Sequence, residues 1–324
     1  MTHAFPVSDH SDGSTFHNLD AAAETHKGFF ALLKWKFGPA PQEWPKELLK
    51  DAAEPQVSKP VDGDGLRITF INHATVLIQW KSINILTDPV LSEKLGPMSI
   101  LNLKRYRDPG LTFENMPKID YIFVSHNHYD HLDLPTIEKF EERDHPKYIL
   151  PLGVGEYLPK SARDRIIELN WWESQKDEAR GLEITLVPSQ HWSRRSLTDT
   201  NKSLWGAAVF RANGRSVYFG GDTGYAGHFK LTYEKLGAMD VSLVPIGAYE
   251  PRWFMKESHM NPDDAIQAHR DLHSKRSIGI HFGTFRLTDE GIEDPVRDLK
   301  AGLSLGNLSA EDFEVPRNGQ TFSL

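Results

Sequence analysis

The feature that most constrains this chain is the segment SHNHYDHLD at residues 125–133, which directly follows the apolar run IDYIFV. It places three imidazoles and two carboxylates in nine positions, a density that packing alone does not explain. Imidazole is the commonest metal ligand in proteins, and a loop that leaves a strand can turn alternate side chains towards one point. His126 and His128 could hold one ion while Asp130 and His131 face a second. A lone histidine is often a surface or hydrogen-bonded residue, but the cluster as a unit predicts a site for two metal ions.

Composition restricts the ligands and the partners. The sequence has no cysteine, so any metal must be held by imidazole and carboxylate. The 324 residues, 39% of them hydrophobic, allow one large domain or two ordinary ones. A net charge of −8 argues against a nucleic-acid partner. No apolar run is long enough for a transmembrane span and the first residues lack the features of a secretory signal, so we expect a cytoplasmic protein.

The chain changes character at Leu66. Residues 1–65 read as an amino-terminal extension without a strand pattern; its one concentrated apolar stretch, residues 26–38, predicts a short amphipathic helix. Residues 66–324 alternate short β-rich runs with helical patterns, which predicts a layered α/β domain with mixed sheets. We expect one hairpin at the Lys81-Ser82 turn and a second at the Asn213-Gly214 turn. Helices are expected at 134–143, with Asp133 as the cap and Pro135 in the first turn, and at 262–272. The expected strands are 66–71, 75–80, 83–87, 119–125, 147–152, 165–170, 182–189, 204–210, 216–220, 241–247 and 277–282.

Three more residues of ligand type follow predicted strands. His191 comes after LEITLVPSQ, Asp222 lies within GGDTG after SVYF, and His281 ends SIGI. Active sites of α/β folds tend to lie at such strand ends, so several strands would deliver ligands to one edge of a sheet. The glycines Gly220, Gly221 and Gly224 would allow tight turns and close backbone approach around Asp222, although GGDTG alone could be an ordinary turn.

These residues are similar, position by position, to the H-x-H-x-D-H motif and the later His, Asp and His ligands of the metallo-β-lactamase superfamily. The stretches INHATVLIQ, LTDPV, SHNHYDHLD, PSQHW, NKSLWG, GDTGY, PIGAYEPRWFM and HFGTF resemble the N-acylphosphatidylethanolamine-hydrolysing phospholipase D family over about residues 66 to 290. The resemblance implies an αββα sandwich of two mixed sheets flanked by helices, and two zinc ions per chain. It also implies cleavage of a phosphodiester, by a hydroxide that bridges the metals, into an N-acylethanolamine and phosphatidic acid. In this family pattern the first zinc is held by His126, His128 and His191, the second by Asp130, His131 and His281, and Asp222 bridges the two.

Several roles stay open at this level. Asp222 would fix the separation of the ions, and Asp130 would orient the nucleophile or bind the second ion. His259, in a segment that borders the active site in the family, is a candidate for stabilising the leaving alkoxide, or it is a loop histidine with a structural hydrogen bond. An acyl pocket competes with core packing as the role of four aromatic residues: Trp192, Tyr249, Trp253 and Phe254.

Two other functions and three partners also remain open. The same fold hosts hydrolases of other esters and lactones, and a metal-dependent binding protein without turnover is a further alternative. The expected substrate is a phospholipid or another phosphodiester. Residues 26–38 either make peripheral contact with the inner face of the membrane or simply pack on the sandwich, and a homodimer is the other expected association.

Overall fold

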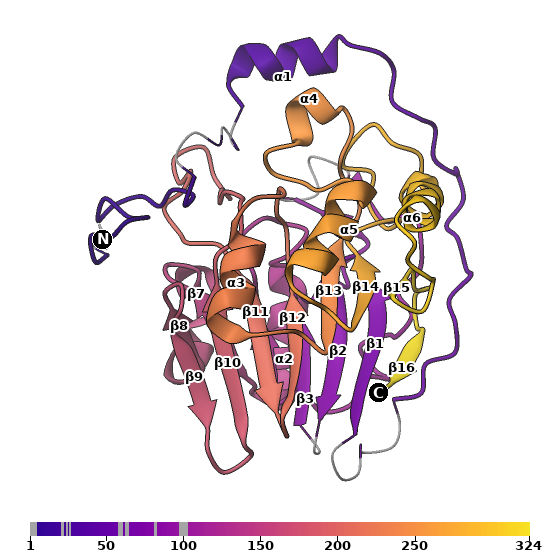
Figure 1. Cartoon of the computed structure of the whole chain (residues 1–324). Coiled ribbons are helices and arrows are strands. Elements are labelled where there is room, and N and C mark those ends of the chain that lie inside the picture. The colour runs from indigo at the N-terminus through magenta and orange to yellow at the C-terminus, as the bar shows by residue number, and fades with distance from the viewer. Residues whose placement is uncertain are drawn as a thin grey trace.

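A computed structural model describes residues 5–20, 23, 25, 27–57, 61, 65–80, 83–96 and 103–324. Within these residues, two seven-stranded sheets face each other and helices cover their outer sides (Figure 1). In spatial order, the first sheet consists of β16 (Thr321–Ser323), β1 (Leu66–Asn72), β2 (Thr75–Trp80), β3 (Ile83–Thr87), β6 (Tyr121–Phe123), β7 (Lys147–Pro151) and β8 (Ile166–Leu169). The second consists of β15 (Phe313–Glu314), β14 (Arg276–Ile280), β13 (Val241–Pro245), β12 (Arg215–Phe219), β11 (Ala207–Ala212), β10 (Leu182–Val187) and β9 (Ser174–Asp177).

The remaining elements are helices and a small ribbon. The ribbon pairs β4 (Lys94–Leu95) with β5 (Leu103–Lys104). The described α-helices are α1 (Phe29–Lys36), α2 (Leu134–Asp144), α3 (His228–Leu236), α4 (Arg252–Met255), α5 (Pro262–Asp271) and α6 (Asp294–Leu305), and two short 3-10 helices span Gly155–Tyr157 and Lys160–Arg165. Helix α2 packs on the outer face of the first sheet, whereas α5 packs on β13 of the second.

Strand direction explains where loops gather. In the second sheet β12, β13 and β14 are parallel, and β10 runs the same way because it is antiparallel to β11, which is antiparallel to β12. In the first sheet β3, β6, β7 and β8 are parallel. The carboxyl ends of parallel strands meet at one edge of a sheet, so the loops that follow these strands share one end of each sheet. The two mixed sheets and their outer helices confirm the predicted sandwich.

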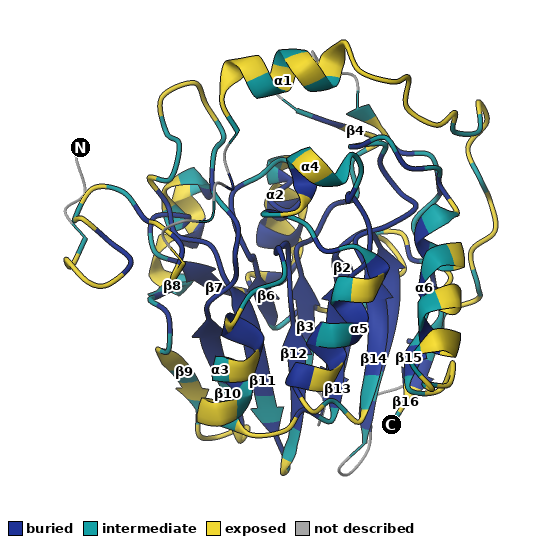
Figure 2. Ribbon diagram, turned by 45° about the horizontal axis from the view of Figure 1, so that its top comes forward, coloured by how far each residue is buried: buried dark blue, intermediate teal, exposed yellow. Residues whose placement is uncertain are grey.

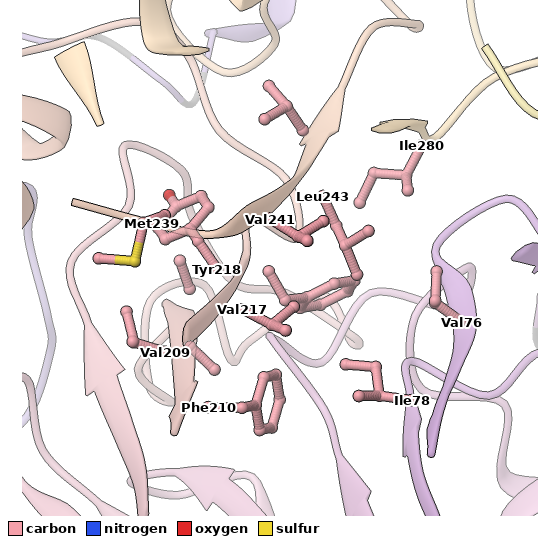
Figure 3. Packing of buried hydrophobic residues seen from close by; sticks show 14 of the residues in the cluster. Val76, Ile78, Val209, Phe210, Val217, Tyr218, Met239, Val241, Leu243 and Ile280 are labelled. Carbon is pink, nitrogen blue, oxygen red and sulfur yellow. The ribbon is translucent and has the colours of Figure 1, made fainter. Parts of the chain in front are cut away.

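The core lies between the inner faces of the two sheets. Figure 3 shows Val76 and Ile78 of β2 opposite Phe210 of β11 and Val217 of β12, all fully buried. Strand β2 is buried along its whole length because its alternate residue Leu77 belongs to a second cluster under α2. Burial on both faces explains why TVLIQW is a nearly continuous apolar run rather than an alternating one.

The predicted elements are largely present. Asn213 and Gly214 both have positive φ, 54° and 70°, as the tight hairpin turn requires. Lys81 and Ser82 lie outside the described residues. The first predicted helix starts after Asp133 as expected, but this carboxylate does not cap it; it accepts from the backbone N–H groups of Leu91 and Ser92 instead. Sequence reasoning missed α3 and α6.

The amino-terminal segment crosses the outside of the sandwich. Helix α1 confirms a helix within residues 26–38; none of its described residues is buried, and it lies above α4 (Figures 1 and 2). All three phenylalanines of this stretch are strongly exposed: Phe29, Phe30 and Phe37. Throughout the described ranges, we find no helix with the length and apolar character that a bilayer crossing requires.

Candidate metal centre

The histidine-rich loop leaves β6 and returns into α2. The N–H groups of His131 and Leu132 both donate to the carbonyl of His128, at 3.1 and 2.8 Å, so residues 128–132 form a tight turn. His126 and His131 are almost completely buried, at 1% and 0% exposure. Buried polar groups need a hydrogen-bond or metal partner. Two buried imidazoles in one turn, outside the apolar core between the sheets, therefore indicate a common polar ligand.

Three strands of the second sheet deliver the other candidates to the same place. His191 follows β10, Asp222 follows β12 and His281 directly follows β14. The glycines around Asp222 have the role that the sequence predicted: Gly221 has φ of 57°, and a Cβ there would lie 2.6 Å from Cβ of Ser125. The second sheet can therefore approach the histidine loop of the first sheet only with glycine at this position.

His126, His128 and His191 form the first group of ring nitrogens. Nδ1 of His128 lies 2.8 Å from Nε2 of His126 and 3.2 Å from Nε2 of His191. Each of the three residues can offer one ring nitrogen such that all three lie within 4.8 Å of one another. The loop of the first sheet and the β10 loop of the second thus converge on one point.

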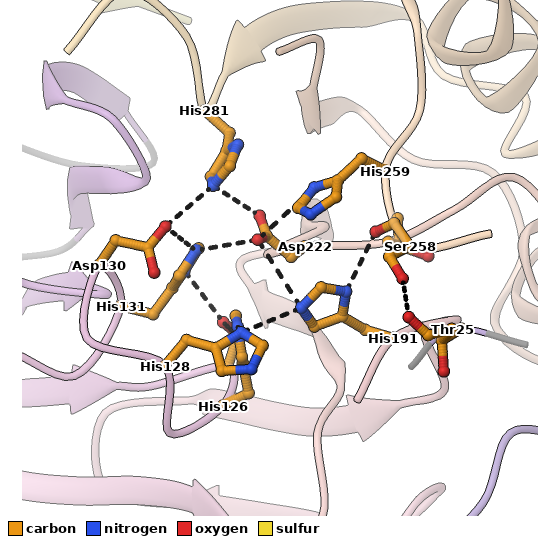
Figure 4. Close-up of polar contacts among 12 residues, drawn as sticks. Thr25, His126, His128, Asp130, His131, His191, Asp222, Ser258, His259 and His281 are labelled. Atoms are coloured by element: carbon orange, nitrogen blue, oxygen red, sulfur yellow. Dashed lines mark hydrogen bonds and ion pairs between the residues drawn. The ribbon is translucent and has the colours of Figure 1, made fainter. Parts of the chain in front are cut away.

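Asp130, His131 and His281 form the second group, and Asp222 lies between the two groups (Figure 4). Oδ2 of Asp130 is 3.5 Å from Nε2 of both His131 and His281. Asp222 faces the second group through Oδ2, 3.2 Å from Nε2 of His131, and Oδ1, 3.0 Å from Nε2 of His281. The same Oδ2 lies 3.8 Å from Nε2 of His191 in the first group.

The donor atoms fit metal ions better than they fit one another. The buried Nε2 atoms of His131 and His281, and Oδ1 of Asp222, make no hydrogen bond of acceptable geometry, although they lie only 3.0 to 3.5 Å from one another or from other atoms of the cluster. A buried polar atom without a partner costs roughly 1–3 kcal/mol, so several at one point call for a common ligand. Imidazole and carboxylate are ligand types that zinc accepts. The cluster could therefore hold metal.

Neighbouring groups orient the ring atoms. Nδ1 of His131 donates to Oδ2 of Asp88 at 2.6 Å, and Ser125 donates to the same carboxylate through its N–H and Oγ, at 2.7 and 2.6 Å. Nδ1 of His191 donates to the carbonyl oxygen of Ser258 at 3.0 Å. Because Nδ1 donates in both rings, Nε2 is the ring atom left to face the centre and to bind an ion there.

Sequence reasoning missed Asp88 and His73. His73, in the turn between β1 and β2, is 2% exposed, and its Nε2 lies 3.1 Å from Oδ2 of Asp130. It groups with Asp130, His131 and His281 as a set that could hold an ion. For Asp88 the sequence offered a signal, because Asp88 follows β3 just as Asp222 follows β12. For His73 it offered none, because the residue lies in the short turn between two strands.

His259 lies beside the bridging carboxylate. It follows α4, and its Nδ1 is 3.8 Å from Oδ2 of Asp222, with 15% of the side chain exposed. That Nδ1 has no hydrogen-bond partner, so the structure shows no structural hydrogen bond from this atom. The ring is therefore near the reacting region that the ligand set defines, and the same geometry would let it reach an ion shared with His191 and Asp222.

Burial and charge divide the imidazoles into two classes. Burial lowers the pKa of His126 and His191 well below the usual value, and that of His128 to about 4. Burial would also lower the pKa of His281, but Asp222 and Asp130 outweigh it and raise the value to about 9. The histidines of the first group are thus neutral and can bind a cation. In the second group, the carboxylates of Asp222 and Asp130 create a negative environment that favours positive charge.

Comparisons with known proteins agree with this geometry. The profile described as Beta-lactamase superfamily domain matches residues 83–282. N-acyl-phosphatidylethanolamine-hydrolyzing phospholipase D 1 of Caenorhabditis elegans is 39% identical over 246 residues, which cover 73% of this chain and 69% of that protein. The protein of the same description, named as mitochondrial, in Saccharomyces cerevisiae is 35% identical over 258 residues, covering 78% of this chain and 55% of that protein.

A solved structure confirms the fold. Igni18, described as a novel metallo hydrolase from the archaeon Ignicoccus hospitalis, has a TM-score of 0.57 at 20% identity, with 80% of this chain and 98% of that chain covered. Together with the His and Asp cluster, the relatives at 35% and 39% identity support a metal-dependent hydrolase. The chain belongs to the metallo-β-lactamase superfamily and, within it, to the family of N-acyl-phosphatidylethanolamine-hydrolysing phospholipase D proteins.

Proposed function

We propose that this protein is a two-zinc phosphodiesterase that cleaves N-acylated phospholipids into an N-acylethanolamine and phosphatidic acid. The observation that carries the proposal is the position of Asp222, whose carboxylate faces His191 of the first group and both His131 and His281 of the second. Relatives named for hydrolysis of N-acyl-phosphatidylethanolamine support the substrate class.

In this proposal, the first ion is held by His126, His128 and His191, the second by Asp130, His131 and His281, and Asp222 joins both sets. Zinc in such a site lowers the pKa of a bound water and neutralises charge on a phosphodiester. The protein supplies the orientation: Asp88 holds the ring of His131, and the carbonyl oxygen of Ser258 holds that of His191.

His259 would act on the leaving oxygen. Burial lowers its pKa to about 4, so the ring is neutral near pH 7 and acts as a hydrogen-bond donor rather than as a charged acid. An N–H group directed at an oxygen on which negative charge develops stabilises the departing alkoxide. The proposal assigns no metal bond to His259.

The surroundings of the centre support an amphiphilic substrate. The ring of Trp192 packs edge-on against His128, with centroids 4.5 Å apart, and so provides an apolar wall beside the first group. Away from the candidate ligands, a cavity of about 660 Å³ lies between the α1 segment and α4, lined by Trp35, Tyr249 and Trp253 together with charged residues such as Glu250 and Asp289. Tyr249 is buried and Phe254 packs on Trp35, so only part of the aromatic set is available to a ligand.

Membrane contact through α1 is part of the proposal. Exposed Phe29 and Phe30 accompany Lys34 and Lys36 on the same helix, a combination that suits an anionic bilayer surface. The site would then work at the inner face of a membrane, from the cytoplasm; cell fractionation checks the compartment. Sedimentation of the purified protein checks for the expected homodimer.

Product analysis tests the function. The zinc-loaded protein is incubated with vesicles that contain N-acyl-phosphatidylethanolamine, and mass spectrometry identifies the products; Asp222→Asn, which removes the shared negative charge, is the control. N-acylethanolamine and phosphatidic acid in equal amounts, absent with Asp222→Asn, would support the proposal. Cleavage of a carboxylic ester or lactone instead would assign another hydrolase activity, and no turnover of any ester by a metal-loaded protein would favour a binding protein.

A further inference from the structure

One polar side chain of the amino-terminal segment is buried against a proposed metal ligand. Asn18 is 6% exposed and lies 173 positions before His191 in the sequence. Its Nδ2 donates to the carbonyl oxygen of His191 at 2.9 Å, and its Oδ1 accepts from the N–H of His191 at 3.0 Å. One side-chain amide thus satisfies both backbone groups of His191, as a neighbouring strand would.

A second contact from the same segment reaches the ring of His191. Nδ1 of His191 donates to the carbonyl of Ser258, and Oγ of Ser258 donates to the carbonyl of Thr25 at 2.9 Å (Figure 4). Nδ2 of Asn18 also donates to Oγ1 of Thr25 at 3.2 Å. The backbone and, through Ser258, the ring of His191 are therefore both tied to the amino-terminal segment.

Asn18 is itself held in place. Nε1 of Trp205 donates to Oδ1 of Asn18 at 3.2 Å, and Trp205 is 1% exposed. Phe16 is part of the main core cluster, and its N–H donates to the carbonyl of Asn201 at 2.8 Å. The segment cannot shift without taking a phenylalanine out of the core, so Asn18 is a rigid support rather than an occasional contact.

We propose that Asn18 is a positioning residue of the metal centre, which fixes the backbone of His191 so that Nε2 stays aligned with His128 and Asp222. The inference rests on the proposed function for its metal. His191 follows β10 by a loop, and the bridge between Gln190 and Gly224 ends one residue before it. Among the described residues no ladder of β10 reaches His191, so the two hydrogen bonds from Asn18 take over the role of the sheet there. Residues 16–20 and Thr25 then belong functionally with the hydrolase domain, although the sequence pattern separates them from it at residue 65.

The test uses the full chain and two variants of Asn18. Asn18→Leu removes both hydrogen bonds to His191, together with those to Thr25 and Trp205, at similar side-chain volume. Asn18→Asp keeps the acceptor for the His191 N–H but turns a carboxylate oxygen towards the His191 carbonyl, and it serves if the leucine variant does not fold. The matched control is His10→Ala, which removes another contact of the same segment, with Asn170 and Trp171, away from the centre.

Three readouts separate positioning from a general loosening of the structure. Zn²⁺ titration against a chelator should show metal affinity reduced by about 10- to 100-fold in the Asn18 variants, and Co²⁺ bound in place of Zn²⁺ should show shifted visible absorption bands. Amide hydrogen exchange of the metal-free protein should be faster at His191 in Asn18→Leu. His10→Ala should match the wild type in each measurement.

Unchanged affinity in the folded Asn18 variants would overturn the inference, and so would an equal loss in His10→Ala. A wild-type protein that took up no metal would contradict the proposed function instead. In that case, amide hydrogen exchange at His191 still tests whether Asn18 holds the backbone of His191. Equal exchange rates in the wild type and in Asn18→Leu would refute this.

Discussion

Replacing Asp88 by asparagine should damage the second metal group while leaving the fold. Asp88 has φ of 35°, a region that asparagine tolerates, and it is completely buried, so the substitution changes neither shape nor backbone strain. The wild-type carboxylate accepts from three donors: the ring Nδ1 of His131 and, from Ser125, the N–H and Oγ. A carboxamide offers only one oxygen.

The magnitude follows from the two orientations of the amide. With its oxygen towards His131 and its NH₂ towards Ser125, two N–H donors oppose each other in a buried place, which costs about 1–3 kcal/mol of folding free energy. With the amide reversed, its NH₂ group points at His131, and Nδ1 of that ring must accept a hydrogen bond instead of donating one. The ring proton then moves to Nε2, the atom that faces Asp222, and prevents it from binding a metal ion. Loss of such an orienting partner typically reduces metal affinity or activity by about 10- to 100-fold.

The assay combines chelator competition, elemental analysis and urea unfolding. Asp144→Asn is the matched control, because Asp144 is also buried and accepts a backbone N–H, that of Ile119 at 2.9 Å, but lies at the end of α2. Both variants should lose stability, and only Asp88→Asn should lose metal. Wild-type affinity for both ions in a folded Asp88→Asn protein would refute the reasoning about the tautomer of His131.

Three further predictions address other parts of the molecule. His259→Leu, which removes the ring N–H, should keep the metal content but slow alkyl phosphodiesters far more than activated aryl ones; equal losses, or lost metal, would remove the proposed role. Serine at both Phe29 and Phe30 should weaken liposome binding and bilayer turnover and spare a soluble aryl phosphodiester, whereas Leu305→Ser, equally exposed on α6, should change neither. Burial lowers the pKa of His228 from 6.5 to about 3, so the unfolded state binds more protons below pH 6.5 and the protein becomes less stable as the pH drops. Between pH 7.5 and 5, the free energy of unfolding in urea should therefore fall by about 2 kcal/mol less in His228→Gln than in the wild type. Equal decreases in the two proteins would contradict this.

The candidate ligands could be found from the sequence because each follows an apolar strand. His191, Asp222 and His281 are polar residues at the ends of buried runs, and the end of a strand is where a sheet directs its loops. Two stacked sheets, in contrast, came from the family resemblance, because a strand buried on both faces, such as β2, does not reveal which layer covers it. The hydrophobic pattern therefore predicts the strands and helices themselves but not how the two sheets and the helices stack on one another.

Positioning residues escaped prediction for a physical reason. Asp88 and Asn18 act through hydrogen bonds to residues 43 and 173 positions away, so no local spacing identifies them. Helix α3 buries only His228, Phe229 and Thr232, which is too weak a stripe to recognise. Helix α6 offered a usable signal, since Val296, Leu299 and Leu303 lie at helical spacing after Pro295.

The most direct test of the account is the number of metal ions bound per chain. Elemental analysis of the purified protein, after saturation with Zn²⁺ and removal of excess, should give two ions for the wild type, because the two groups of donor atoms share Asp222. Asp222→Asn should fall below two, since a neutral amide bridges two cations poorly. A wild-type stoichiometry of one or less under saturating Zn²⁺ would contradict the paired metal centre.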